Sequence, residues 1–199
     1  MKNGLRITVG AVLGLVLMLH TATGWAQWDL DSERSTLNFI SIKNNTVAET
    51  HSFTSIVGYI GAEGNVQVAI DLDSVDTLIE IRNERMREML FETAKFPAAK
   101  ISAQVDPAMI AGLADAGTII ADIPVTLSLH DMSRKIIAPL TIISDTAGRL
   151  RVMTTRPIVV NVADFGLGAG VEALREIAGL QSIVGAVPVT MSLTFVRSE

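Results

Sequence analysis

An alternation of apolar and polar residues with a period of two constrains the fold of this chain more than any other feature. Residues 66–72 show it most clearly, because Val66, Val68, Ile70 and Leu72 alternate with polar or small side chains. The same pattern recurs in residues 37–42, 123–129, 140–142, 149–154, 158–162 and 187–196. Turn signals rich in Gly, Asn and Asp separate these runs. Many short strands of this kind predict an antiparallel β-sandwich or β-barrel.

Three segments depart from the strand pattern and predict helices. Residues 80–94 are expected to form the main helix, because Met86, Met89 and Leu90 fall on one face and charged residues cover the rest. Short helices are expected near residues 107–115, opened by an Asp-Pro pair, and near residues 171–180. No repeat or linker indicates a second domain.

The N-terminus has the order of a secretory signal. Lys2 and Arg6 precede the apolar run Ile7–Leu19, and small residues lie at the expected cleavage position after Ala26. The alternative is a retained membrane anchor, but the run is shorter than the ~20 residues that span a bilayer. No second apolar span follows, so an integral membrane protein is not expected. The expected division is a cleavable signal peptide over residues 1–26 and one domain over residues 27–199.

Charge and composition exclude several classes of function. The chain has 21 Asp and Glu residues against 16 Lys and Arg residues, and cleavage would remove two of the basic ones. An acidic chain is a poor partner for nucleic acid, whose binding depends on clustered Lys and Arg. The absence of cysteine excludes disulfides, thiolate metal sites and cysteine nucleophiles. No cofactor is expected.

Four motifs, in order, resemble those of the YceI-like family of exported bacterial proteins. The first contains Leu30-Asp31, Ser35 and Leu37-x-Phe39, which match the family's first strand. The second runs from Asp71-Leu-Asp-Ser-Val-Asp-Thr77 through a charged helix to Phe96-Pro97. The third is Leu127-Ser-Leu-His130 with Ser133-Arg134, and the fourth is Asp164-Phe-Gly-Leu167. Together they cover about residues 28–196.

The chain also departs from the family pattern, as a divergent member would. Asn83 stands where the family usually has aspartate, and Asp131 stands where it usually has glycine. Residues 44–53 replace a His-Leu-Gly-Val segment.

The resemblance implies a lipocalin-like barrel of about eight antiparallel strands with a helix over its side or end. It also implies a periplasmic location and an elongated apolar interior that holds a polyisoprenoid or similar long-chain amphiphile for transport, storage or sequestration. Dimerisation is suggested by the resemblance alone. The inward face, inferred from polarity, gives the expected ligand-binding lining as Phe39, Val68, Ile70, Val125, Leu127, Leu140, Ile142, Val160, Phe165 and Met191.

His51 and Arg82 are candidate contacts for a head group at the barrel mouth. For the helix arginines, the competing interpretation is a solvated face with local ion pairs to Glu84 and Glu88. Beyond the signal, His51 and His130 are the remaining histidines, and their isolated positions are not typical of a metal site. His130 is expected to be structural.

Two other functions compete with ligand binding. Aromatic residues make up 5% of the chain, and its many aliphatic side chains could fill the barrel, leaving a structural or interaction protein without a ligand. The other is an enzyme that acts on a lipid. We expect no enzyme, because the sequence has no cysteine, no Gly-x-Ser-x-Gly elbow and no acid–base cluster.

Overall fold

A computed structural model describes residues 26–113 and 117–198 of the chain. Residues 1–25 of the expected signal peptide lie outside this part. In the described part, no helix has the length and apolar character needed to cross a membrane.

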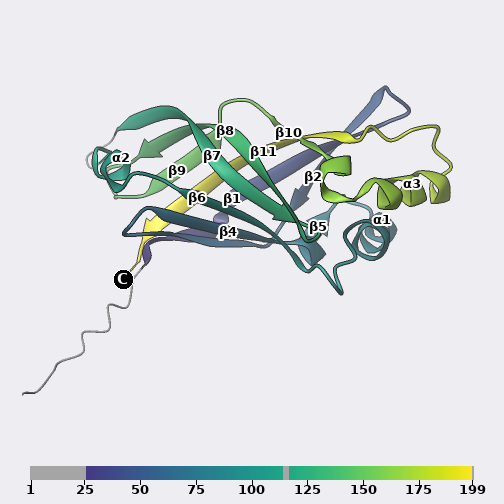
Figure 1. The fold of residues 1–199 in the computed structure, drawn as a ribbon, viewed down its shortest axis with the longest axis horizontal. Coiled ribbons are helices and arrows are strands. Elements are labelled where there is room, and N and C mark those ends of the chain that lie inside the picture. Colours follow the sequence, from purple (N-terminus) through teal and green to yellow (C-terminus); the bar gives the residue numbers. More distant parts are fainter. Residues whose placement is uncertain (1–25, 114–116, 199) are drawn as a thin grey trace, which may run out of the picture.

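The domain is mainly β, and its strands form one sheet that closes on itself (Figure 1). Closure results from the antiparallel pairing of the last strand, β11, with the first, β1. The closed ring contains eight strands in the order β1, β3, β4, β6, β7, β8, β9 and β11, which confirms the expected lipocalin-like barrel. The strands are β1 Ala26–Lys43, β2 Val47–Phe53, β3 Ile56–Gly61, β4 Asn65–Asp71, β5 Val75–Asp76, β6 Ala98–Gln104, β7 Thr118–Leu129, β8 Met132–Ser144, β9 Leu150–Thr154, β10 Ile158–Asn161 and β11 Ala186–Arg197.

Three strands outside the ring extend the barrel wall at one end. The long strand β1 pairs with β3 near its start and with β2 from Leu37 onward, and its register with β11 shifts between Asp31 and Thr36. Strand β5 pairs with the end of β2, and β10 pairs with the first residues of β11. The barrel wall therefore extends further at this end than at the opposite end.

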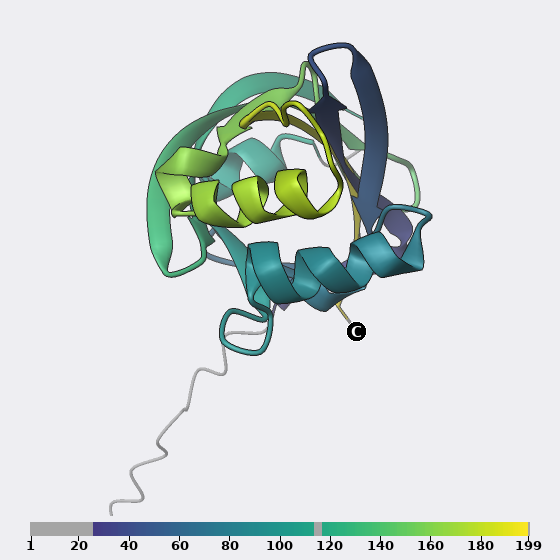
Figure 2. The ribbon, with the colours of Figure 1, turned by 90° about the vertical axis from the view of Figure 1, so that its right-hand side faces the viewer.

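Two helical segments lie across the extended end (Figures 1 and 2). One is α1, Glu80–Arg85, which continues directly into the π-helical segment η2, Met86–Phe91. The other is α3, Gly168–Ile177, which contacts η2 and follows the short 3-10 helix η3, Val162–Phe165. A third helix, α2 at Pro107–Ala111, lies at the opposite end (Figure 1).

The helix boundaries differ from those that the sequence predicts. The main helix ends at Phe91 rather than residue 94, because Glu92 adopts a left-handed conformation with φ of 46°. Helix α2 ends at Ala111, although Asp106 caps its N-terminus and Pro107 opens it as expected. Helix α3 begins at Gly168 and ends at Ile177, three residues earlier at each end than predicted.

Candidate ligand-binding site

The barrel interior contains three hollow compartments, which we call the mouth, central and deep compartments. Their volumes are about 310, 180 and 80 Å³ respectively. Phe39, Met86 and Leu90 line both the mouth and central compartments, and Val125 and Met191 line both the central and deep ones. Shared walls place the three in a row along the barrel, from the helices α1 and α3 to helix α2.

The central and deep compartments are lined almost entirely by hydrocarbon. Thr154 is the one polar residue on the wall of the central compartment, and the deep compartment has none. Met109 and Ile110 of helix α2 contribute to the wall at the deep end. A wall without hydrogen-bonding groups favours an apolar occupant over water.

Nine of the ten residues predicted from polarity as lining lie on these walls. Ile70, Leu127 and Val160 line the central compartment, and Val68, Leu140 and Ile142 line the deep one. Phe39 lies between mouth and centre, and Val125 and Met191 lie between centre and deep end. The tenth, Phe165, is 1% exposed and packs in the hydrophobic core outside these three compartments. Whether the nine contact a ligand remains a prediction.

Polar side chains gather at the mouth compartment, where strands β1 and β2 meet helix α1. Glu49 Oε2 accepts from Arg82 Nη1 at 2.6 Å and from Lys43 Nζ at 2.8 Å. These contacts with Lys43 and Arg82 outweigh the opposing effect of burial and lower the pKa of Glu49 below its ordinary value. The carboxylate is therefore ionised at neutral pH and joins β2 to both cations.

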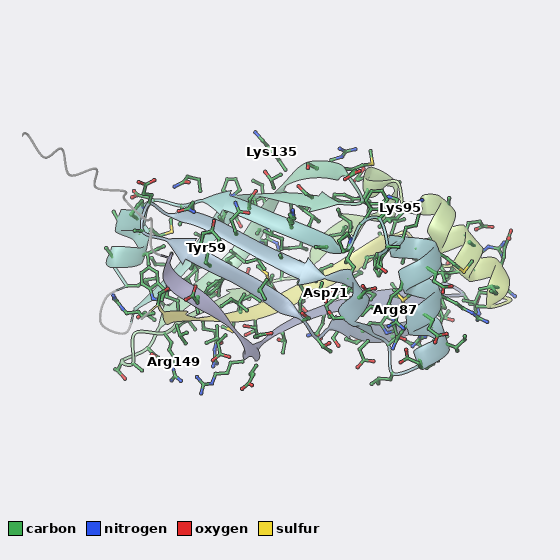
Figure 3. All side chains as sticks on the ribbon, turned by 90° about the horizontal axis from the view of Figure 1, so that it is seen from below. Tyr59, Asp71, Arg87, Lys95, Lys135 and Arg149 are labelled. Atoms are coloured by element: carbon green, nitrogen blue, oxygen red, sulfur yellow. The ribbon has the colours of Figure 1, made fainter. Side chains whose placement is uncertain are left out.

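Arg82 is held in place by its second contact as well as by Glu49. Its Nη2 donates to the carbonyl oxygen of Thr77 at 2.6 Å. The competing expectation, in which the helix arginines pair with Glu84 and Glu88, is wrong for the two arginines whose ion pairs are seen. Arg82 pairs across to strand β2, and Arg87 pairs with Glu80 at 2.9 Å. Arg87 and Lys95 mark the helical end of the molecule, and Arg149 lies toward the other end (Figure 3).

His51 lies on the inner wall of the mouth and is 4% exposed. Its Nε2 is 2.8 Å from Ser41 Oγ, and its ring lies 5.1 Å from the ring of Phe39. Burial, reinforced by the positive charge of Arg82, lowers the pKa of His51 below 6.5. The imidazole is therefore neutral at pH 7, and its Nδ1 has no hydrogen-bond partner among the described residues.

Sequence reasoning missed several residues of the mouth wall. Lys43 carried no motif, yet it lines the mouth compartment. Arg85, for which a solvated face competed with a head-group contact, also lines it. Val171 and Leu174 of helix α3 also line it. The apolar stripe along helix α3 could have revealed these residues. An apolar helix face must pack against another part of the protein or line a cavity.

His130 lies away from this site. It adopts a left-handed backbone conformation at the turn between β7 and β8, and its ring is 4.2 Å from the ring of Phe96. No cluster of three or more metal-ligating side chains occurs in the ranges 26–113 and 117–198.

A closed barrel with this row of apolar compartments can be compared with known proteins. The model of a family described as the YceI-like domain matches residues 28–195. The chain belongs to the YceI-like family. This confirms the resemblance carried by the four motifs.

Solved structures extend the comparison. A polyisoprenoid-binding domain from Saccharophagus degradans, implicated in plant cell wall breakdown, is 39% identical, with a TM-score of 0.85; the match covers 87% of this chain and 100% of that domain. BcnA from Burkholderia cenocepacia shares the YceI-like fold at 17% identity and a TM-score of 0.66, over 83% of this chain and 99% of its own. The curated proteins contain no match.

Proposed function

We propose that this protein binds a long-chain amphiphile, such as a polyisoprenoid, inside its barrel and transports, stores or sequesters it without chemical change. One observation carries the proposal: the compartments form a row whose inner two are apolar and whose outer one holds the charged groups. Each methylene that leaves water for such an interior contributes ~0.8 kcal/mol. A long chain therefore gains ample affinity without strong polar contacts.

The YceI-like relative from Saccharophagus degradans supports this ligand class, because its whole length aligns with this chain and it binds polyisoprenoid.

The size of the interior argues against a barrel filled by its own side chains. An engineered apolar cavity of ~150 Å³ is enough to bind benzene, and the central compartment alone measures about 180 Å³.

The contact between Ser41 and His51 is the one feature that favours an enzyme, because a serine hydroxyl near a histidine is the start of a nucleophilic site. Such sites need a third group that orients the histidine. The Nδ1 of His51 has no such partner among the described residues, and its lowered pKa makes it a weak base. The geometry therefore favours ligand binding over nucleophilic catalysis by Ser41.

Extraction of the native protein tests the proposal. The mature protein is purified from its host, extracted with organic solvent and examined by mass spectrometry. We expect a long-chain lipid in stoichiometric amount. A clean extract, combined with no binding of added isoprenoids, would contradict the proposal and favour the filled barrel or the enzyme.

We also propose that the protein is exported to the periplasm and cleaved after Ala26, which the N-terminal sequence supports. Cell fractionation followed by N-terminal sequencing tests this. A mature chain that begins at Gln27 in the periplasmic fraction is the expected result, and an intact N-terminus in the cytoplasm would contradict it.

A further inference from the structure

A further hollow lies on the outer side of the barrel, and we call it the side pocket. It measures about 310 Å³ and lies between the segment 92–97, which follows η2, and the hairpin that joins β7 to β8. Leu129 is the one lining residue that it shares with the three inner compartments. The second and third sequence motifs reach this pocket through Phe96-Pro97 and His130, which do not line the proposed lipid site.

The hairpin turn at the edge of the side pocket has an unusual sequence for its backbone. His130 and Asp131 both have positive φ, of 52° and 58°. Two-residue hairpin turns of this kind favour Asn and Gly, and the family usually has glycine where this chain has Asp131. The ring of His130 packs 4.2 Å from the ring of Phe96 and forms part of the pocket wall. The turn gives no comparable structural reason for the carboxylate of Asp131.

Two opposite charges in the side pocket lack partners. Lys100 of β6 and Asp131 of the turn both line it, and Asp131 is the one acidic residue on its wall. Neither forms an ion pair with any residue in the ranges 26–113 and 117–198. Lys95, the other lysine of the wall, already pairs with Glu92 at 2.6 Å. A pocket with one unpaired cation and one unpaired anion fits a zwitterion better than an ion of a single sign.

The rest of the wall supplies hydroxyl groups and apolar surface. The hydroxyl oxygens of Ser128 and Ser133 are 2.7 Å apart, and Ser128 is the register partner of both Ser133 and Lys100. Register partners lie on one face of a sheet, so an anion at Lys100 also meets hydroxyl donors. Phe96 and Pro97 add apolar surface that can cover a hydrocarbon side chain.

We propose that the side pocket binds a free α-amino acid with an apolar side chain. The carboxylate of the amino acid contacts Lys100 and the serine hydroxyls, its ammonium group contacts Asp131, and its side chain packs against Phe96. These charge-assisted contacts are stronger than those between neutral groups. The pocket lies outside the barrel interior, so this inference goes beyond the proposed lipid binding and does not depend on it.

Three ligands with the same aromatic ring test the two charges separately. The mature protein is titrated with L-phenylalanine, with 3-phenylpropanoate, which lacks the ammonium group, and with phenethylamine, which lacks the carboxylate. Amide NMR spectra report both the affinity and the residues that respond. We expect phenylalanine to bind about threefold to fivefold more tightly than either analogue, since exposed charge pairs contribute modestly. The shifts should be confined to residues 92–100 and 128–133.

Variants at the two charges should give a crossed pattern. Lys100→Gln should weaken phenylalanine and 3-phenylpropanoate and leave phenethylamine unchanged. Asp131→Asn should weaken phenylalanine and phenethylamine and leave 3-phenylpropanoate unchanged, and asparagine tolerates the left-handed backbone of this turn. Lys135→Gln is the control, because Lys135 is an exposed residue of β8 outside the pocket lining (Figure 3). It removes the same charge as Lys100→Gln and should change no affinity.

Three results would overturn the amino-acid site. The first is equal affinity for all three ligands, or phenylalanine binding that neither Lys100→Gln nor Asp131→Asn weakens. The second is a set of shifts at residues of the mouth compartment instead of the side pocket. The third is the absence of any shift with phenylalanine near its solubility limit. The proposed lipid binding stands in each case.

Discussion

Asn83 accepts two hydrogen bonds from Thr77 inside the molecule. Its Oδ1 lies 2.9 Å from the backbone nitrogen of Thr77 and 2.6 Å from the hydroxyl oxygen, and neither residue is more than 6% exposed. The carbonyl oxygen of Thr77 in turn accepts from Arg82. The pair therefore fixes the turn before α1 and, through it, one wall of the mouth.

Asn83→Ala should destabilise the fold. The Thr77 hydroxyl keeps a contact of 3.3 Å with the carbonyl oxygen of Ile79, but the backbone N–H is left buried and unpaired. An unpaired buried donor costs about 1–3 kcal/mol, so the free energy of unfolding in urea should fall by about that amount. Asn83→Asp keeps an Oδ1 that can accept both hydrogen bonds from Thr77, so this variant should lose less stability at neutral pH. Equal losses in the two variants would show that the hydrogen bonds do not matter.

Helix α3 approaches η2 most closely at Gly170. A Cβ built on Gly170 would lie 2.6 Å from the carbonyl oxygen of Met89 and 2.8 Å from the Cα of Leu90, both backbone atoms that cannot move aside independently. Gly170→Ala should therefore displace α3 from η2. We expect the free energy of unfolding to fall by about 1–3 kcal/mol, as overpacking does elsewhere, and bound lipid to dissociate faster.

Gly168→Ala is the matched control in the same helix, because a Cβ at Gly168 meets no atom within 4 Å. Alanine favours helix over glycine by about 1 kcal/mol, so this variant should be neutral or slightly more stable. Stopped-flow dissociation and thermal unfolding measure both variants. Similar behaviour of the two would refute the role of close packing at Gly170.

Local sequence signals predicted much of this fold. Because side chains alternate across a strand, the pattern at Val68 and Ile70 indicated which residues point inward, and both lie on cavity walls. The closure of the barrel could not be predicted from local sequence signals. Leu37 pairs with Met191 across most of the chain, and nothing near either residue encodes this pairing; the expectation of a closed barrel came from the family motifs.

The candidate site was predicted less completely than the fold. Arg82 stood at a motif position and His51 in an unusual polar segment, and both line the mouth. Lys43 and Glu49 became functional candidates only when β1 and β2 paired and placed them 2.8 Å apart. A charge cluster whose residues come from three separate elements has no characteristic spacing that a sequence motif could reveal.

Val125→Trp should block the barrel, because Val125 lies on the wall shared by the central and deep compartments. The larger side chain occupies space that the ligand chain needs. We expect affinity for an isoprenoid to fall at least about tenfold, a loss of ~1.4 kcal/mol, measured by titration of the folded variant. Ile120→Trp on the same strand is the control, because Ile120 is 76% exposed and should not affect binding. Unchanged binding in both would show that the ligand does not reach Val125.

The burial of His51 makes stability depend on pH in a direction that can be worked out. Burial, and next the charge of Arg82, lower the pKa of His51 in the folded protein below its ordinary value of 6.5. As the pH falls below 6.5, the unfolded chain binds a proton at this position before the folded chain does. The contribution of His51 to the free energy of unfolding is therefore complete above pH 6.5. It declines as the pH falls toward the lowered pKa.

His51→Gln removes this titration while its amide can still bond Ser41. Urea unfolding between about pH 7.5 and 5.5 should show a decline for the natural protein that is shallower in the variant, whatever their difference at high pH. Glu49 does not mimic the effect, because contacts with Lys43 and Arg82 move its titration below this range. Identical slopes would mean that His51 is solvated, and the mouth would then be wetter than its 4% exposure indicates.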